Sequence, residues 1–179
     1  MSGDILSLDL ASTTGWCRGA PGGKVVHGSI KLAPPGASHG EKGASLLRWL
    51  TPQLKIRPAL LVFEAPMAPS QMAGRTTVST ARVLLGLPFL TETVAYLSGL
   101  YGDRVREANV QDVRKHFIGQ RTVRGGDPKA VVMRECRRLG FEPRDDNAAD
   151  AIALWSYAAA IIAPEIGIAS TPLFAGGGE

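Results

Sequence analysis

The uninterrupted apolar run at residues 60–63, Leu-Leu-Val-Phe, constrains the fold more than any other segment. A strand that is apolar at every position is buried on both faces, which is typical of the centre of a sheet covered by helices on both sides. Residues 5–8 form a second short run, interrupted only by Ser7. The two runs predict an α/β domain, and 179 residues, 45% of them hydrophobic, suffice for one sizeable core.

Turns rich in glycine, proline and hydroxyl residues separate three strands at the start of the chain. We expect strands over 4–10, from Gly15 onward after a polar turn at 11–15, and over 24–32. Because the turns between them are short, these strands should form an antiparallel meander.

Helices and strands alternate in the remainder of the chain. The pattern predicts a helix over 41–54, a strand over 59–64, a helix over 76–100 that Gly86 and Pro88 kink or split, a strand over 104–108, and three helices capped by Asn109, by Asp127, and by Asp145 or Asp146. This order resembles the RNase H-like fold, a mixed five-stranded sheet flanked by helices, in which the first and fourth strands are parallel neighbours. We expect such a domain over residues 1–163 and a flexible tail over 164–179.

Four acidic residues stand where this topology would bring them together. Asp9 ends the first strand, Glu64 ends the fourth, and Asp146 and Asp150 lie one turn apart in the last helix. Buried acids are unfavourable unless a cation or hydrogen bonds compensate them, and Mg²⁺ prefers oxygen ligands. We therefore predict a nuclease site with two Mg²⁺ ions, for which Mn²⁺ would substitute, in which these four acids are the metal ligands.

Each acid taken alone also has a purely structural interpretation. Asp9 would cap the turn that follows it, Glu64 would pair with an arginine, and Asp146 would cap the last helix. Asp150 would stabilise that helix through its dipole. Only the joint position of the four acids favours a metal site.

Positive charge is concentrated in one part of the chain, although the net charge is only +4. Residues 104–144 hold 11 of the 20 lysines and arginines but only five acids. A solvated helical face would explain this stretch by itself. Beside an acidic cluster, however, it indicates a polyanion held over metal ions, and thus a nucleic acid.

Neither a disulfide framework nor a membrane segment is evident. Cys17 and Cys136 stand alone, which predicts reduced thiols in a cytoplasmic protein rather than a disulfide or a zinc site. No apolar run is long enough to cross a bilayer, and no charged-then-apolar leader precedes the first strand, so we expect no membrane partner.

Five segments recur in order: Leu8-Asp9 with the following Thr-Gly-Trp, Val62-Phe63-Glu64, 113–119, 127–131 and 147–154. This set, spread over roughly residues 4–160, resembles the RuvC family of Holliday junction resolvases. The resemblance implies a homodimeric, Mg²⁺-dependent endonuclease in a bacterial or phage-infected cell. It would cut two strands of a four-way DNA junction symmetrically and leave 5′-phosphate and 3′-hydroxyl ends.

The resemblance also implies roles for individual residues. It makes Asp9, Glu64 and Asp150 metal ligands and places Arg114 and Lys129 near the scissile phosphate. The chain departs from the family at the fourth acid, because Asn147 occupies the family's acidic position. We expect Asp146 to take that role, since Asp145 lies five residues before Asp150 and off its helix face.

Further DNA contacts are expected around the acids. Met67, in the loop after Glu64, is a candidate apolar wedge for the junction centre, with core packing as the alternative. Contacts to phosphate are expected from Arg75, Thr76, Thr77, Arg114, Lys115, Arg121, Arg124 and Lys129. For Arg121 and Arg124, in the basic loop, solvated charge is the alternative.

Other classes of protein are less favoured. Sugar kinases and actin-like ATPases open with a similar Asp-x-Gly-Thr-Thr motif, but Ala11 replaces that glycine, and 179 residues cannot hold their paired domains. A general RNase H-like nuclease acting on flaps, branched DNA or RNA–DNA hybrids is the nearer alternative. A non-catalytic junction-binding scaffold does not explain why four acids are present.

Overall fold

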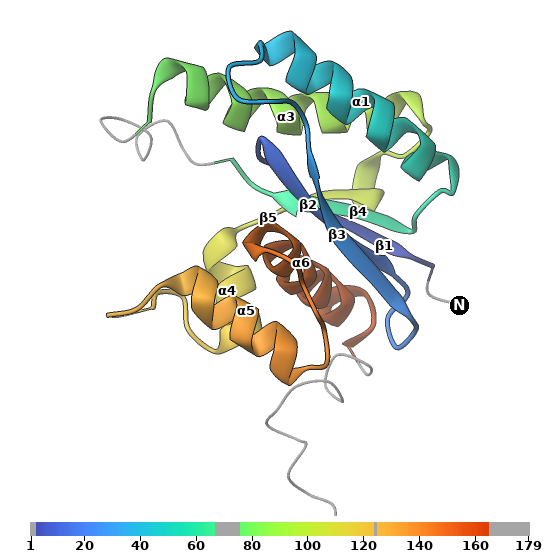
Figure 1. The fold of residues 1–179 in the computed structure, drawn as a ribbon. Coiled ribbons are helices and arrows are strands. Elements are labelled where there is room, and N and C mark those ends of the chain that lie inside the picture. The colour runs from blue at the N-terminus through green and yellow to red at the C-terminus, as the bar shows by residue number, and fades with distance from the viewer. Residues whose placement is uncertain (1–2, 67–75, 124, 165–179) are drawn as a thin grey trace, which may run out of the picture.

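A mixed five-stranded sheet forms the centre of the computed structural model, which describes residues 3–66, 76–123 and 125–164 (Figure 1). The strands are β1 (Ile5–Asp9), β2 (Thr13–Gly19), β3 (Val25–Lys31), β4 (Leu60–Glu64) and β5 (Val105–Ala108). Their order across the sheet is β3-β2-β1-β4-β5. The first three are antiparallel, whereas β4 is parallel to both β1 and β5, so the predicted α/β fold class and topology are confirmed.

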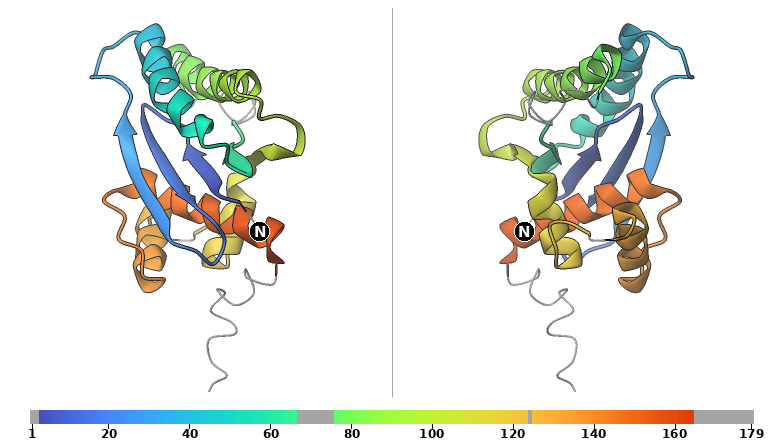
Figure 2. Two further views of the ribbon diagram at one scale, coloured as in Figure 1. Left: turned by 90° about the vertical axis from the view of Figure 1, so that its right-hand side faces the viewer. Right: turned by 90° about the vertical axis from the view of Figure 1, so that its left-hand side faces the viewer.

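Helices cover both faces of the sheet (Figure 2). The helices α1 (His39–Lys55) and α3 (Val78–Leu97) lie on one face. The other face carries α4 (Val110–Ile118), α5 (Pro128–Arg138) and α6 (Asp146–Ile162), of which α6 packs directly against β1 and β2. This two-sided cover explains why β1 and β4 are apolar at nearly every position.

Side-chain alternation along the two central strands decides which residues face α6. Leu6 and Leu8 of β1 belong to the core beneath α1 and α3, whereas Ile5 belongs to the core beneath α6. Because successive side chains in a strand point to opposite faces, Asp9 lies on the α6 side of the sheet. The same alternation in β4, where Val62 belongs to the α6 core, places Glu64 on that side too.

The predicted helix starts are confirmed in three places. Asn109, Asp127 and Asp145 each accept a hydrogen bond from a backbone N–H in the first turn of α4, α5 and α6, respectively. Gly140, just after the end of α5, has a φ of +85°, a conformation that glycine adopts without strain.

The structure differs from the expected local structure in two places. Residues 78–97 form one helix, which Gly86 and Pro88 do not split. Pro88 is buried within this helix, although proline cannot donate the usual backbone hydrogen bond there. The polar turn is also shorter than expected, because β2 begins at Thr13 and pairs Gly15 with Asp9.

No helix in the part of the chain that the structure describes is long and apolar enough to cross a membrane. The predicted tail lies, from residue 165 onward, outside the described residues.

Candidate functional site

Asp9 and Glu64 lie side by side at the ends of two parallel strands. The ladder between β1 and β4 pairs Leu8 with Phe63, and the next residue in each strand is the acid. Both carboxylates are half-buried on the face that α6 covers. The predicted neighbourhood of these two acids is therefore present.

Two close contacts fix the first turns of α6 on the sheet. The buried Ser7 hydroxyl donates a hydrogen bond of 2.7 Å to the carbonyl oxygen of Ala151. At Gly15, a Cβ atom would lie 1.9 Å from the carbonyl oxygen of Asn147, so only glycine fits there without movement of the helix. Asn147 and Ala151 lie on either side of Asp150 in α6, and Asp150 lies close enough to the end of β1 for its charge to act on Asp9.

The two acids at the start of α6 have different surroundings. Asp145 is the N-cap: one carboxylate oxygen accepts from the backbone N–H of Ala148 at 2.9 Å, and the other accepts from the hydroxyl of Ser29. Asp146, the first residue of the helix, instead forms an ion pair with Lys129. Asp145 therefore already serves to join α6 to β3, which leaves Asp146 as the acid on the side of Lys129.

The pKa values show that three acids share one environment. Burial and the nearby charges of Glu64 and Asp150 raise the pKa of Asp9 to about 8. Burial and the charge of Asp150 raise the pKa of Glu64 to about 7, and the pKa of Asp150, raised mainly by burial, is about 6. The pKa of Asp146 is lowered, chiefly by the hydrogen bond from Lys129.

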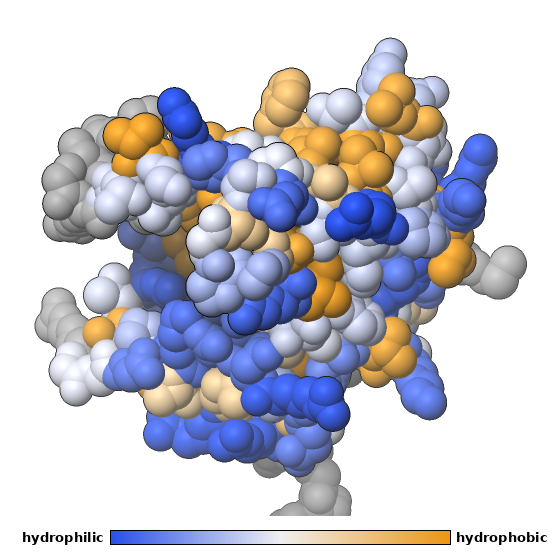
Figure 3. Space-filling model, turned by 45° about the horizontal axis from the view of Figure 1, so that its top comes forward, coloured by the Kyte–Doolittle hydropathy of each residue, from blue (hydrophilic) through white to orange (hydrophobic). Residues whose placement is uncertain are grey.

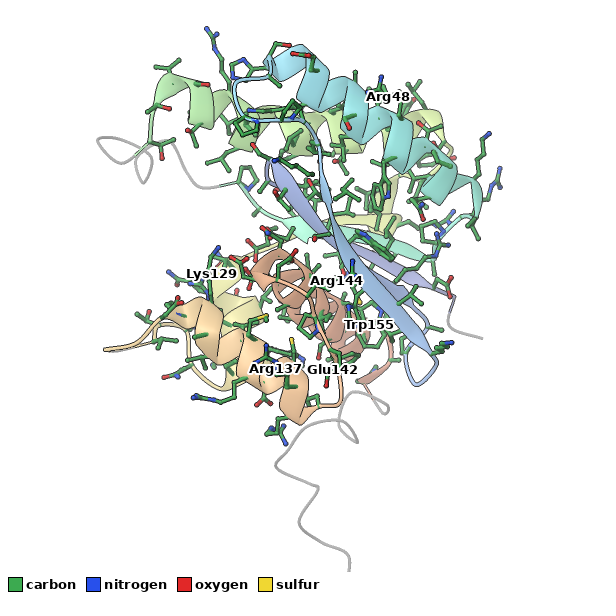
Figure 4. All side chains as sticks on the ribbon, viewed as in Figure 1. Arg48, Lys129, Arg137, Glu142, Arg144 and Trp155 are labelled. Carbon is green, nitrogen blue, oxygen red and sulfur yellow. The ribbon has the colours of Figure 1, made fainter. Side chains whose placement is uncertain are left out.

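Two cationic side chains flank the acids. Arg114, from α4, lowers the pKa of both Glu64 and Asp150, and therefore lies near them. Lys129, from α5, has the same effect on Asp9 and Asp150 and faces the start of α6 (Figure 4). Both residues thus lie where a phosphate group placed over the acids would meet a positive charge.

The acids match a hard divalent cation in their chemistry, since they offer only carboxylate oxygens from three elements. Across the described ranges, no group of three or more His, Cys, Asp or Glu side chains is gathered tightly enough to form a metal site as it stands. Mutual repulsion between like charges keeps neighbouring carboxylates apart, and side chains can change rotamer when a cation removes that repulsion. We conclude that these acids are suitable ligands for a divalent cation, although their oxygen atoms do not lie close enough together to coordinate one as they stand.

The other predicted DNA contacts are less closely tied to the acids. Arg121 forms an ion pair of 3.0 Å with Asp112, and Lys115 is exposed on α4. Thr77 is the N-cap of α3 and accepts from the backbone N–H of Thr80, while Thr76 is half-buried before it. Met67, Arg75 and Arg124 lie outside the described residues.

The sequence alone gave no reason to single out Ser7 or Lys42. Ser7 reads as a minor interruption of an apolar strand, and its partner Ala151 is far away in the chain. Lys42 lies on an ordinary amphipathic helix, yet it lines a groove beside Lys129 and Asp146. Both features depend on which elements the fold brings together.

Comparison with known proteins finds a likeness in structure. No protein-family model matches the sequence, and no curated protein matches it. The structure resembles RuvC from T. thermophilus in complex with a Holliday junction substrate, with a TM-score of 0.68, 16% identity, and cover of 92% of this chain and 97% of that chain. It also resembles a second Thermus thermophilus RuvC structure, with a TM-score of 0.63 and 17% sequence identity. That match covers 89% of this chain and 95% of the other chain. At these identities the likeness concerns the fold, and the chain has a RuvC-like fold.

Proposed function

We propose that the protein is a metal-dependent endonuclease that resolves four-way DNA junctions. The observation that carries this proposal is the cluster formed by Asp9, Glu64 and Asp150, three half-buried acids whose pKa values are all raised, chiefly by burial, with Glu64 and Asp150 adding to the shift of Asp9. Arg114 and Lys129 flank the cluster. The RuvC-like fold supports the choice of substrate, because one structure with that fold holds a Holliday junction.

The acids would hold Mg²⁺, with Mn²⁺ as a substitute. Repulsion and burial make the ionised cluster unfavourable without a cation, so a divalent ion is the compensation that its chemistry favours. Asp9 feels the charges of Glu64, Asp150 and Asp146, and is therefore the acid best placed to be shared by two ions. Glu64, Asp146 and Asp150 would complete the two sites.

The residues around the acids would bind and orient DNA. When bound, two ions would supply the activation of water and the stabilisation of the leaving oxygen that phosphodiester hydrolysis needs. Arg114 and Lys129 would hold the scissile phosphate by charge-assisted hydrogen bonds. Lys129 would exchange its present partner Asp146 for phosphate, which would free Asp146 to act as a ligand.

The exposed face of α3 supports the proposal that the enzyme is a homodimer. Val78, Leu85, Phe89 and Tyr96 are all exposed and are spaced by seven, four and seven residues along one side of the helix. This spacing is typical of a helix that packs against another helix. Apolar side chains gather over α1 and α3, whereas hydrophilic ones dominate near α5 (Figure 3). A second copy paired through α3 would supply the second active site that paired incisions need.

A cleavage assay on defined substrates tests the proposed function. With Mg²⁺, the protein should nick a synthetic four-way junction at paired sites, and it should act poorly on Y-shaped DNA, plain duplex and RNA–DNA hybrid. Asp9→Asn should bind the junction without cutting it. If hybrid or flap substrates were cut as well as the junction, the protein would be a general RNase H-like nuclease and not a resolvase. Junction binding without cutting by the wild type would instead indicate a scaffold.

A further inference from the structure

A groove beside Asp146 lies between the two helical layers. It has a volume of about 410 Å³ and is lined by the turn after β1, by α1 and α3 on one side, and by the starts of α5 and α6 on the other. Lys129 and Asp146 stand at one wall, so the groove begins beside the acidic cluster. Figures 1 and 2 show that these helices belong to opposite layers of the molecule.

The polar side chains in this groove are mainly hydrogen-bond donors. Lys42 of α1 stands across from Lys129 of α5. Hydroxyl groups come from Ser12 of the turn and Thr13 at the start of β2, and from Ser79 and Thr80 of α3. Lys42 is half-buried and takes part in none of the ion pairs found among the described residues. The acid present, Asp146, is already paired with Lys129.

Ammonium and hydroxyl groups of this kind recognise phosphate rather than bases. Contacts to the DNA backbone come mainly from Lys, Arg, Ser and Thr, whereas unstacked bases are held on aromatic rings. Within the described part of the chain, no aromatic side chain lines the groove. The apolar residues Val83 and Leu84 provide a surface that sugar rings can contact without requiring a particular base.

We propose that this groove holds the sugar–phosphate backbone of the strand next to the scissile phosphate, with Lys42 as its principal cation. The inference rests on the proposed function and adds α1 and the start of α3 to the DNA-binding surface. Phosphates beyond the cleavage point would lie between Lys42 and the hydroxyl groups of Ser79 and Thr80. The DNA strand would then contact both helical layers while its scissile phosphate lies over the acids.

Binding of a fluorescent four-way junction, measured by anisotropy in EDTA at several salt concentrations, tests the groove without cleavage. Lys42→Ala should weaken binding by roughly three- to tenfold, lower the slope of log K against log salt by about 1, and act equally on junctions of different sequence. Lys42→Arg should restore most of the binding, because it retains the positive charge. The matched control is Lys55→Ala, which removes the same charge from the last turn of α1 and should leave affinity and slope unchanged.

Crosslinking provides a second test that does not depend on affinity. Both natural cysteines are buried, so a photo-crosslinker attached to Lys42→Cys or Lys55→Cys will react from the chosen position. Crosslinks to DNA should form from position 42 and not from position 55. If wild-type protein binds junctions but positions 42 and 55 behave alike in both experiments, the proposed role of the groove in DNA binding is refuted, whereas the proposed function is not. If wild-type protein does not bind branched DNA, the proposed function falls as well.

Discussion

Asp9, Glu64 and Asp150 make the folded protein less stable unless something compensates their charge. Each has a raised pKa, and burial is the largest cause for all three. A group with a folded-state pKa above its unfolded value contributes stability that is complete below the unfolded pKa and is lost progressively as the pH rises through the folded-state pKa. For Asp9 that contribution is complete below about 3.8 and is lost as the pH rises through about 8.

Asp9→Asn should therefore stabilise the metal-free protein at alkaline pH. In EDTA at pH 8.5 we expect a gain on the order of 1 kcal/mol in the free energy of unfolding, and a much smaller gain at pH 4, where the folded-state aspartate is protonated and the unfolded-state aspartate is only partly ionised. Mg²⁺ should stabilise the wild type more than the variant at pH 8.5. Urea unfolding measures both effects, and an equal gain at the two pH values would contradict the electrostatic explanation.

The two acids at the start of α6 should differ in their effect on cleavage. Asp146→Asn should abolish junction cutting, because it removes a carboxylate beside Lys129 and the cluster. Asp145→Asn should largely spare cutting, because asparagine is also a good N-cap and retains an oxygen for the N–H of Ala148. Single-turnover cleavage with Mg²⁺ compares the two variants at matched folding. The reverse result would make Asp145 the fourth ligand.

At the scale of elements, the sequence predicted what depends on local chemistry. The caps of α4 and α5 and the acids at the ends of β1 and β4 follow from propensity and from alternation, and the structure contains them. The uninterrupted α3 and the early start of β2 were missed, because burial of Pro88 and pairing of Gly15 are decided by tertiary packing. The groove at Lys42 was missed for the same reason, since it exists only once α1 and α5 are placed.

Gly15 shows how one such contact positions an element. Gly15→Ala should displace the start of α6, because the new Cβ atom would meet the backbone of Asn147. We expect a loss of about 2 kcal/mol or more in the free energy of unfolding, together with a higher Mg²⁺ concentration for half-maximal cutting. Gly43→Ala is the control: its Cβ would make an ordinary contact of 3.4 Å with Leu90, and alanine favours a helix. Equal behaviour of the two variants would show that α6 is positioned by other contacts.

At the scale of the whole molecule, the two helical layers have different surfaces. The layer of α4, α5 and α6 carries the acids of α6 and most of the basic stretch, whereas α3 exposes large apolar residues. Phe89 and Tyr96 are 71% and 70% exposed on the side of α3 away from the core. Large apolar residues gathered on one exposed face indicate an interaction surface rather than a surface left in water. In the proposed enzyme, that face is where the second copy packs.

The double variant Phe89→Ser and Tyr96→Ser should convert a dimer into a monomer that retains its fold. Light scattering after size exclusion should show half the mass, and cleavage of a junction carried on supercoiled plasmid should give single, uncoupled nicks instead of paired ones. Ile56→Ser is the matched control, because Ile56 is 67% exposed at the end of α1 and does not belong to the exposed apolar side of α3. It should remain dimeric and cut in pairs. A double variant that stays dimeric would exclude α3 as the interface, and a wild type that is monomeric even on junction DNA would exclude paired incision by a homodimer.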